Sequence, residues 1–295
     1  MPAQDAHARF NTRAGRVFDV FNVLVLTAVG LLALLPFVYV LAGSLATEYE
    51  ITTRPFFVWP NEVSTAAYRS ILSSDVFVRS FVTTVVVTTV GTVVQLSASV
   101  LMAYPLSKVD LPGRRTILTL VVVTIVFSAG IIPTFLVVKD LGLLNTYWSL
   151  ILPMAINPFS LIIIKNFFEQ LPQELQESAT IDGANELQVL RHVVLPLSKP
   201  VLATFALFYA VAIWNDYMSP LLYLSDQSMW TLQMILRQVT ASATLTAEDL
   251  ATEVPPPAQG IKFAVVIIAT VPVLLIYPFL QKHFAKGLLI GSVKG

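Results

Sequence analysis

Cysteine is absent from this chain of 295 residues, and only 12% of its residues carry a charged side chain. Without cysteine, no disulfide framework and no cysteine metal site can form. Soluble domains carry about 25% charged residues, so half that share indicates a chain that lies in a lipid bilayer. The formal net charge is zero, which leaves no electrostatic argument for a nucleic-acid partner.

Motifs for covalent chemistry are missing as well. The chain has no G-x-x-x-x-G-K-[ST] sequence, the loop that cradles ATP phosphates. It has neither a nucleophile-elbow sequence nor an H-E-x-x-H pair. The histidines His7, His192 and His283 lie far apart and lack metal-ligand spacing. We therefore expect no enzyme activity and no metal or cofactor bound by this chain; if the protein uses ATP, another chain must hydrolyse it.

Long apolar runs are what the chain has in abundance, with 56% hydrophobic residues and a mean hydropathy of +0.75. Crossing the hydrocarbon core takes about 20 apolar residues. Such segments must be helices, because each backbone polar group in lipid has to be paired within its own segment. The predicted fold is an all-α integral membrane protein with about six transmembrane helices. The segments are Val20–Ala42, Phe81–Leu106, Ile117–Val138, Trp148–Phe168, Val201–Leu224 and Ile261–Leu280.

The lysines and arginines are unevenly distributed between the loops of this predicted topology. Twelve lie on the side of both termini and six on the other side. Because cytoplasmic loops are enriched in these residues, both termini and the loop at 169–200 are predicted to be cytoplasmic. The whole chain, 1–295, is expected to form one transmembrane domain with a cytoplasmic N-terminus at 1–19 and a cytoplasmic tail at 281–295.

The polar stretch at 172–200 has the sequence signals of two short helices. Pro172 suits the first turn of a helix, where its missing N–H is tolerated. Asp182 and Gly183 predict the end of that helix, and either Asp182 or Asn185 can cap the next one. We expect the two helices to lie across a membrane face. They form either a docking surface for a protein outside the membrane or an ordinary connector.

The second of these helices is expected to stop before the fifth span. Leu195-Pro196 and Lys199-Pro200 are the signals, because proline cannot continue a helix without losing a backbone hydrogen bond.

A cluster of polar and aromatic residues lies late in the fifth predicted span. Asp216 is the most costly residue there, because a charge at the centre of a span costs at least about 2.5 kcal/mol on insertion scales. Trp214, Asn215 and Tyr217 surround it in sequence. Aromatic faces and amides suit a sugar, which has apolar faces and hydroxyl groups. Alternatively, the aromatic residues belong to the interfacial belt and Asp216 pairs with a neighbouring helix. Both interpretations stay open.

Other spans contain residues that disturb a regular helix. Asn157-Pro158 in the fourth span predicts a kink, which either lines a pathway or serves packing. Gly130 and Pro133 in the third span allow the same two interpretations. Gln95 in the second span is expected to hydrogen-bond to another helix.

The polar stretch closely resembles the "EAA" loop of binding-protein-dependent ABC importer permeases. That pattern is E-A-A, three residues, G, nine residues, I-x-L-P. Here the spacing is kept, with Ser178 at the second position and Val193 in place of isoleucine. The chain also resembles the carbohydrate branch of these permeases, and in detail the subgroup that handles oligosaccharides derived from polysaccharides. The matching segments are Glu177-Ser178-Ala179, Gly183, Val193 to Pro196, Arg16 to Asn22, Ala103 to Ser107, Ile132 to Thr134, Trp214-Asn215 and Gly287 to Gly295.

The resemblance implies a permease subunit of an ATP-driven importer for oligosaccharides or polysaccharides, alginate-like ones included. It implies a second permease subunit, two cytoplasmic ATPase subunits that bind ATP and Mg, and an extracytoplasmic solute-binding protein. The protein would be located in a bacterial cytoplasmic membrane, with this chain in contact with lipid. Residues of the EAA loop would couple to the ATPase: Glu177, Ser178, Ala179, Asp182, Gly183, Leu195 and Pro196. The residues expected along the substrate pathway are Asn157, Trp214, Asn215, Asp216 and Tyr217.

Two other functions compete with this one. A proton-coupled secondary sugar transporter would use Asp216 as the proton carrier. Loss of uptake on removal of ATP, with the proton gradient maintained, would separate the two kinds of transporter. An integral-membrane enzyme is disfavoured, because the sequence offers no acid/base or metal cluster.

Overall fold

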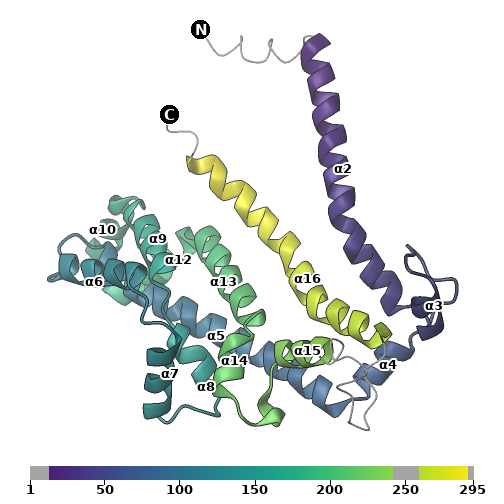
Figure 1. Ribbon diagram of the computed structural model, residues 1–295. Coiled ribbons are helices and arrows are strands. Elements are labelled where there is room, and N and C mark those ends of the chain that lie inside the picture. The colour runs from purple at the N-terminus through teal and green to yellow at the C-terminus, as the bar shows by residue number, and fades with distance from the viewer. Residues whose placement is uncertain (1–12, 242–258, 292–295) are drawn as a thin grey trace. The chain divides into compact units, whose positions relative to one another are not determined.

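The computed structural model describes the backbone of residues 13–241 and 259–291. Within these ranges all elements are helices, which confirms the predicted all-α class (Figure 1). Most of the predicted N-terminal segment 1–19 and the end of the 281–295 tail lie outside the described residues. The chain divides into two compact units, which are described separately. Unit 1 comprises Met1–Ile71 and Leu245–Ile268, and unit 2 comprises Leu72–Thr244 and Ala269–Gly295.

Unit 1 is held together by aromatic packing between its helices. These are α2 (Arg13–Ser44), α3 (Glu48–Thr53), most of α4 (Ala66–Leu72) and the first turns of α16 (Gln259–Gly291). The Tyr39 ring stacks on Phe56 and lies edge-on to Phe263, with centroid distances of 5.7 and 5.6 Å. Gly43 allows α2 to approach α16, because a Cβ at this position would overlap the Phe263 ring.

The start of α16 is capped by a residue that lies far away in the sequence. The Glu48 carboxylate accepts hydrogen bonds from the backbone N–H groups of Gln259 at 2.9 Å and Gly260 at 3.2 Å. These are among the N–H groups that have no partner within the helix, and a negative charge also favours this end of the helix dipole.

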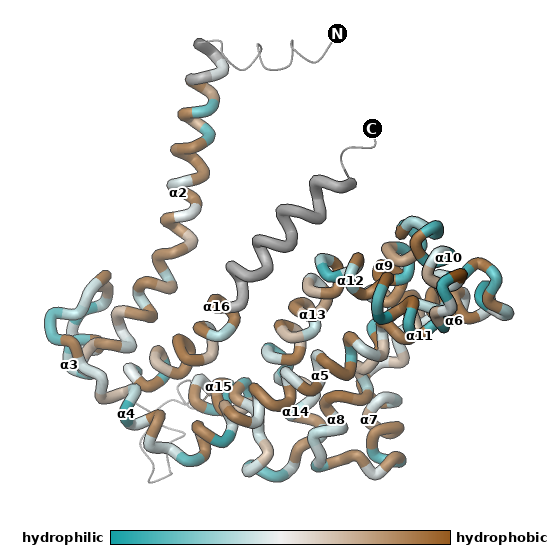
Figure 2. The backbone as a smooth tube through the Cα atoms, turned by 180° about the vertical axis from the view of Figure 1, so that it is seen from behind, coloured by the Kyte–Doolittle hydropathy of each residue, from teal (hydrophilic) through white to brown (hydrophobic). Residues whose placement is uncertain are grey.

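Unit 2 is organised around the long helix α5, which packs against α9 and α13. The apolar residues of α5, α13 and α14 are brown in Figure 2, and hydrophilic residues gather around α10. The helices of unit 2 besides the end of α16 are α5 (Asp75–Ser107), α6 (Arg114–Val126), α7 (Ile131–Asp140), α8 (Trp148–Ile151), η2 (Leu152–Met154), α9 (Pro158–Glu169), α10 (Gln173–Ile181), α11 (Glu186–Val189), η3 (Leu190–Val194), α12 (Leu195–Leu197), α13 (Lys199–Trp214), α14 (Met218–Tyr223), η4 (Gln227–Met229) and α15 (Leu232–Ala241).

Two of the predicted spans form single long helices. Val20–Ala42 lies within α2 and Phe81–Leu106 within α5, and each helix is long and apolar enough to cross a membrane alone. The predicted sixth span, Ile261–Leu280, lies within α16. In the described ranges, three further pairs of helices reach the required length only together, because each pair is bent by more than 40° at a short break.

The third, fourth and fifth spans are broken rather than single helices. The disturbances predicted at Gly130 in the third span and at Asn157-Pro158 in the fourth are confirmed as breaks, whereas the break in the fifth span was not predicted. The third breaks between α6 and α7, which form an angle of 119°. Gly130 ends this break with φ at +81°, a conformation that favours glycine. The fourth breaks at 155–157 with a bend of 53°, and Pro158 begins α9 rather than kinking a longer helix. In the fifth span, α13 ends at Trp214 and α14 begins at Met218, with the turn 215–217 between them.

Candidate functional site

The first half of the polar loop folds as its sequence signals predict. Helix α10 begins directly after Pro172 and ends at Ile181, with Asp182 as its C-terminal cap. Gly183 then takes φ of +88°, and its N–H bonds to the Thr180 carbonyl at 3.0 Å. The cap of α11 is Asn185, which resolves the alternative with Asp182.

The start of α11 is a reciprocal capping box. The Asn185 Oδ1 accepts the Gln188 N–H at 2.9 Å, and the Gln188 Oε1 accepts the Asn185 N–H at 2.8 Å. Two N–H groups that lack helical partners are thereby satisfied, which fixes the direction in which the chain enters α11.

The second helix ends before the fifth span, as predicted, but at Leu197 rather than at Leu195-Pro196. The helical segment runs from Glu186 to Leu197 and then bends by 84° into α13. Over Leu190–Val194 it widens to a π-turn, and the Leu195 N–H bonds to the Leu190 carbonyl. Pro196 directly follows this π-turn and lies in α12, the last part of the segment.

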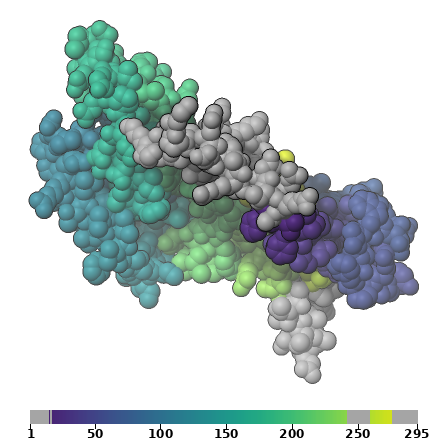
Figure 3. Space-filling view, turned by 90° about the horizontal axis from the view of Figure 1, so that it is seen from above, coloured from purple at the N-terminus to yellow at the C-terminus, as the bar shows by residue number. Residues whose placement is uncertain are grey.

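One side of this helical pair is open to solvent. Glu177, Ser178, Asp182 and Gly183 are all exposed, whereas Ala179 is half-buried. Exposed apolar side chains lie among the polar ones. They were not identified from the sequence as part of the surface, although apolar residues in a polar loop can indicate a binding surface. They are Leu175, Ile181 and Leu187, which are 48%, 85% and 67% exposed. We call the exposed residues of α10 and α11 the α10–α11 surface; they lie at one edge of unit 2 (Figure 3).

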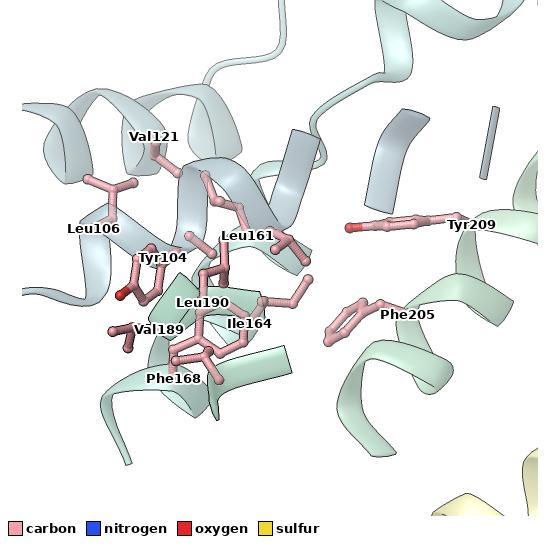
Figure 4. Close-up of a cluster of buried hydrophobic side chains, with 13 residues drawn as sticks. Tyr104, Leu106, Val121, Leu161, Ile164, Phe168, Val189, Leu190, Phe205 and Tyr209 are labelled. Atoms are coloured by element: carbon pink, nitrogen blue, oxygen red, sulfur yellow. The ribbon is translucent and has the colours of Figure 1, made fainter. Parts of the chain in front are cut away.

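The opposite side of the pair is anchored in the largest apolar core of unit 2. Val189, Leu190 and Val194 are buried there. Figure 4 shows Leu190 and Val189 close to Tyr104 of α5 and to Ile164 and Phe168 of α9. Apolar packing therefore connects the α10–α11 surface to two of the long helices.

A polar network at the end of α5 reaches both helices of the surface. The Tyr104 hydroxyl donates a hydrogen bond to the Glu186 carboxylate of α11. Lys108 donates to the Gln176 Oε1 of α10 at 2.9 Å, and its Nζ lies 3.6 Å from the Glu186 Oε2. The Lys108 ammonium also lies 4.9 Å from the centre of the Tyr104 ring. We call these four residues the Tyr104–Glu186 network.

A second network surrounds Glu169 at the end of α9. Its carboxylate forms ion pairs with Arg114 of α6 and, at 2.8 Å, with Lys165. Arg114 Nε also donates to the Leu106 carbonyl at 2.8 Å, so α5, α6 and α9 are joined. A cleft of about 290 Å³ lies beside this network and α10, and its charged lining residues are Lys108, Asp110, Glu169 and Glu177.

The residues from Trp214 to Tyr217 form the turn between α13 and α14. Trp214 is buried, its Nε1 donates to the Ala269 carbonyl at 3.0 Å, and Phe81 lies edge-on to its ring at 6.1 Å. Asn215 is exposed, and its amide donates to the Val211 carbonyl at 2.8 Å. These contacts of Trp214 fit the packing interpretation of that side chain.

The other two residues of the turn are half-buried. Asp216 Oδ1 accepts the Ser219 N–H at 3.1 Å, so the carboxylate caps the start of α14. The Arg237 guanidinium lies 5.8 Å from the centre of the Tyr217 ring. A cation and an aromatic face therefore lie together beside the turn.

The remaining predicted pathway residue lies on a different element. Asn157 caps α9, where its Oδ1 accepts the Ser160 N–H at 3.0 Å. Gln95 donates to the Met154 carbonyl of η2, which confirms the predicted hydrogen bond between helices. Among the described residues, no three His, Asp or Glu side chains are grouped so as to hold a metal ion.

Known proteins are similar to this chain in sequence and in fold. A family profile described as "Binding-protein-dependent transport system inner membrane component" matches residues 95–290. Protein LplC of Bacillus subtilis is 58% identical over 99% of both chains. The polygalacturonan/rhamnogalacturonan transport system permease protein YtcP of the same organism is 51% identical over 95% of this chain and 99% of its own.

A solved structure agrees with these similarities. It is the crystal structure of a bacterial ABC transporter involved in the import of the acidic polysaccharide alginate. One of its chains matches with a TM-score of 0.85 and 32% identity, over 93% of this chain and 99% of that chain.

Proposed function

This chain belongs to the family of binding-protein-dependent transport system inner membrane components, and on that premise we propose what it transports and how transport is driven. The protein is a permease of an ABC importer for oligosaccharides or polysaccharides, and it is not itself an enzyme. The observation that carries the substrate class is the 51% identity, over almost the whole chain, with a polygalacturonan/rhamnogalacturonan permease.

The substrate is an oligosaccharide with carboxylate groups. Polygalacturonan and alginate, the polymers named for YtcP and for the alginate importer, are both chains of uronic acids. Arg237 and Tyr217 fit such a substrate, because a guanidinium binds a carboxylate and an aromatic face stacks on a sugar ring. Asn215, which is exposed on the same turn, is a further contact for the sugar. Trp214, Asp216 and Asn157 hold the turns along the pathway.

ATP drives the transport from outside this chain. Two cytoplasmic ATPase subunits bind ATP and Mg, and one of them docks on the α10–α11 surface. Exposed Leu175, Ile181 and Leu187 support a protein partner, since apolar groups gain from being removed from water. The adjacent cleft has three carboxylates and one lysine among its charged residues, which favours a basic group of the ATPase near Glu177.

The transmembrane part comprises about six crossings. Three are α2, α5 and α16, and the others are α6 with α7, α8 with α9, and α13 with α14. The whole chain acts as one permease domain with both termini and the α10–α11 surface in the cytoplasm. A second permease subunit completes the pathway, and a solute-binding protein delivers the sugar from the other side.

Movement of the ATPase reaches the pathway through rigid contacts. The Tyr104–Glu186 network and the apolar core tie the α10–α11 surface to α5. The bend after Leu197 leads directly into α13, which packs along α5 and ends at Trp214. Displacement of the surface therefore moves both helices and opens or closes the pathway beside the Trp214–Tyr217 turn.

The proton-coupled alternative is not favoured. The family is binding-protein-dependent, and the Asp216 carboxylate already has a role as the cap of α14.

Uptake into proteoliposomes that contain the assembled importer and its binding protein tests this function. We expect ATP-dependent uptake of galacturonate oligomers, and none of neutral glucose oligomers of equal length. The Tyr217→Ala variant should transport less while it still assembles and hydrolyses ATP. Uptake that persists without ATP and follows the proton gradient would contradict the ABC mechanism. Equal uptake of the neutral oligomers would contradict the acidic substrate alone.

A further inference from the structure

A second groove in unit 2 is lined by none of the residues of the α10–α11 surface, although Leu195 and Pro196 at the end of the polar loop line it. It has a volume of about 480 Å³ and lies where α5, the end of the polar loop and the start of α13 meet. Leu96 and Val100 of α5 form one wall, and Leu202 and Ala206 of α13 form another. The walls are therefore mostly apolar.

Two cationic side chains line this groove. Arg191 and Lys199 both line it and both are exposed. Within the described part of the chain, neither forms an ion pair, in contrast to Lys108, Arg114 and Lys165 nearby in the fold. Among the described residues, those that line this groove include no carboxylate. An unpaired cation beside an apolar wall favours an anionic ligand, because the attraction is stronger away from bulk water.

In the topology proposed above, these cations lie at or before the cytoplasmic end of α13, where lipid headgroups are expected. Lys199 is the first residue of α13, and an almost entirely apolar helix follows it. The long stems of lysine and arginine can lie along apolar surface while their charged ends reach the membrane interface. Basic pockets at the ends of membrane helices bind the headgroups of anionic lipids.

We propose that this groove binds an anionic phospholipid. The phosphate lies between Arg191 and Lys199, and one acyl chain lies along Leu96, Val100, Leu202 and Ala206. The lining fits a lipid better than the acidic sugar, because a sugar needs several hydrogen-bonding partners. Ser97 is the one uncharged hydroxyl or amide side chain among the residues that line the groove.

Native mass spectrometry of the purified importer tests this site. The complete complex is mixed with equal amounts of phosphatidylglycerol and phosphatidylcholine that have the same acyl chains. We expect the wild type to retain phosphatidylglycerol about tenfold more than phosphatidylcholine, because each cation near the headgroup contributes to binding. The Arg191→Gln/Lys199→Gln variant should lose this preference. An Arg115→Gln/Lys139→Gln variant is the matched control, since these exposed cations do not line the groove.

A second change tests the apolar part of the groove. Ala206→Trp fills the space without changing the charge, and both lipids should then be lost.

If the double variant fails to assemble, the single variant Lys199→Gln is used to test whether the charge is needed. Equal retention of the two lipids by the wild type, or an unchanged preference in Lys199→Gln, would overturn the proposal. Displacement of phosphatidylglycerol by a galacturonate oligomer would assign the groove to the sugar instead. The measurement reports lipid and not transport, so its result is independent of the proposed function.

Discussion

Carboxylates are used in two different ways in two regions of this protein. Beside the α10–α11 surface, Glu169 and Glu186 bind side chains that come from other helices. Elsewhere, Glu48 and Glu50 of α3 and Asp216 of the turn before α14 accept backbone N–H groups, and Glu50 also pairs with Arg54. The first arrangement links helices to one another, whereas the second fixes the start of a helix or the shape of a turn.

This difference separates parts that transmit movement from parts that hold shape. A lysine or arginine can keep its charge partner while two helices shift, because its side chain is long and has several donors. A capping carboxylate has no such freedom, since the N–H groups that it satisfies are part of the backbone. We therefore expect changes beside the α10–α11 surface to alter coupling, and changes of the capping residues to alter stability.

The largest effect is expected on the α10–α11 surface itself. Glu177→Lys reverses the charge of an exposed residue at the acidic cleft. Removing one partner of an ion pair that becomes buried on docking costs about 3–5 kcal/mol. The ATPase should therefore no longer co-purify with the permease, although the permease itself stays in the membrane. Glu177→Gln is the control for charge reversal and should retain part of the ATPase.

Gly183 provides an independent change on the same surface. Nothing lies within 4 Å of a Cβ built there, but φ is +88°. Gly183→Asp adds a charge where the ATPase docks, and we expect it to detach the ATPase or uncouple its hydrolysis from uptake. Gly183→Asn has nearly the same shape and tolerates the left-handed backbone, so it should be milder. Wild-type co-purification and coupling in both Glu177→Lys and Gly183→Asp would refute docking on this surface.

The next effect concerns the link from the surface to α5. Tyr104→Phe removes the hydroxyl that bonds Glu186, an interaction with a charged group worth about 1.5–3 kcal/mol when it is shielded from water. The Glu186 side chain is 70% exposed, so the loss should lie at or below the bottom of that range. The ATPase should stay bound, while the amount of sugar taken up per ATP hydrolysed decreases.

Another tyrosine gives a matched control for this change. The Tyr209 hydroxyl lies 3.0 Å from the Ser99 hydroxyl inside the core, away from the surface. Tyr209→Phe should lower the thermal stability but leave the uptake per ATP unchanged. If Tyr104→Phe behaves in the same way as Tyr209→Phe, the Tyr104–Glu186 network has a structural role only.

The local signals in the sequence predicted the turn between α10 and α11 well. Gly183 and Asn185 act through their own backbone and their nearest neighbours, so their roles can be read without knowledge of the fold. Gly130 and Asn157-Pro158 likewise marked disturbed helices in the third and fourth spans. The break in the fifth span could not be predicted in the same way. Hydropathy registers only that 201–224 is apolar, and it does not register whether the helix continues through it.

Contacts that depend on where a helix ends or on how helices pack were also beyond the sequence. The sequence marks Asp216 as costly in a membrane. It does not indicate that the carboxylate accepts the Ser219 N–H, because this hydrogen bond requires α13 to end at Trp214. The Tyr104–Glu186 bond joins residues 82 positions apart, and a single sequence gives no signal for such a pair.

A smaller effect is expected from the cap of α14. Asp216→Ala removes the acceptor of the Ser219 N–H, and loss of a helix cap costs about 1 kcal/mol. Asp216→Asn keeps a side-chain oxygen in the same place without the charge, so it should retain both stability and uptake. Thermal unfolding and uptake of the two variants give the measurement. Loss of uptake in Asp216→Asn, with stability unchanged, would show that the pathway needs the charge itself.

The smallest effect concerns the Glu50 carboxylate in unit 1. It accepts the Asn61 N–H at 2.9 and 3.1 Å and pairs with Arg54, and these contacts hold the pKa of Glu50 below its usual 4.5. Because the pKa is lower in the folded than in the unfolded chain, the stabilisation is complete above about pH 4.5 and is lost as the pH falls through the folded value.

Hydrogen exchange at the Asn61 amide, corrected for its intrinsic pH dependence, measures this loss directly. Protection should decrease only below about pH 4.5 in the wild type. In Glu50→Gln, it should be lower at neutral pH and show no such step. The Asn145 amide, which donates to the Tyr223 carbonyl at 2.8 Å, is the control without a carboxylate acceptor. A similar step at Asn145, or its persistence at Asn61 in Glu50→Gln, would show that acid opens the protein more widely and that Glu50 is not the group responsible.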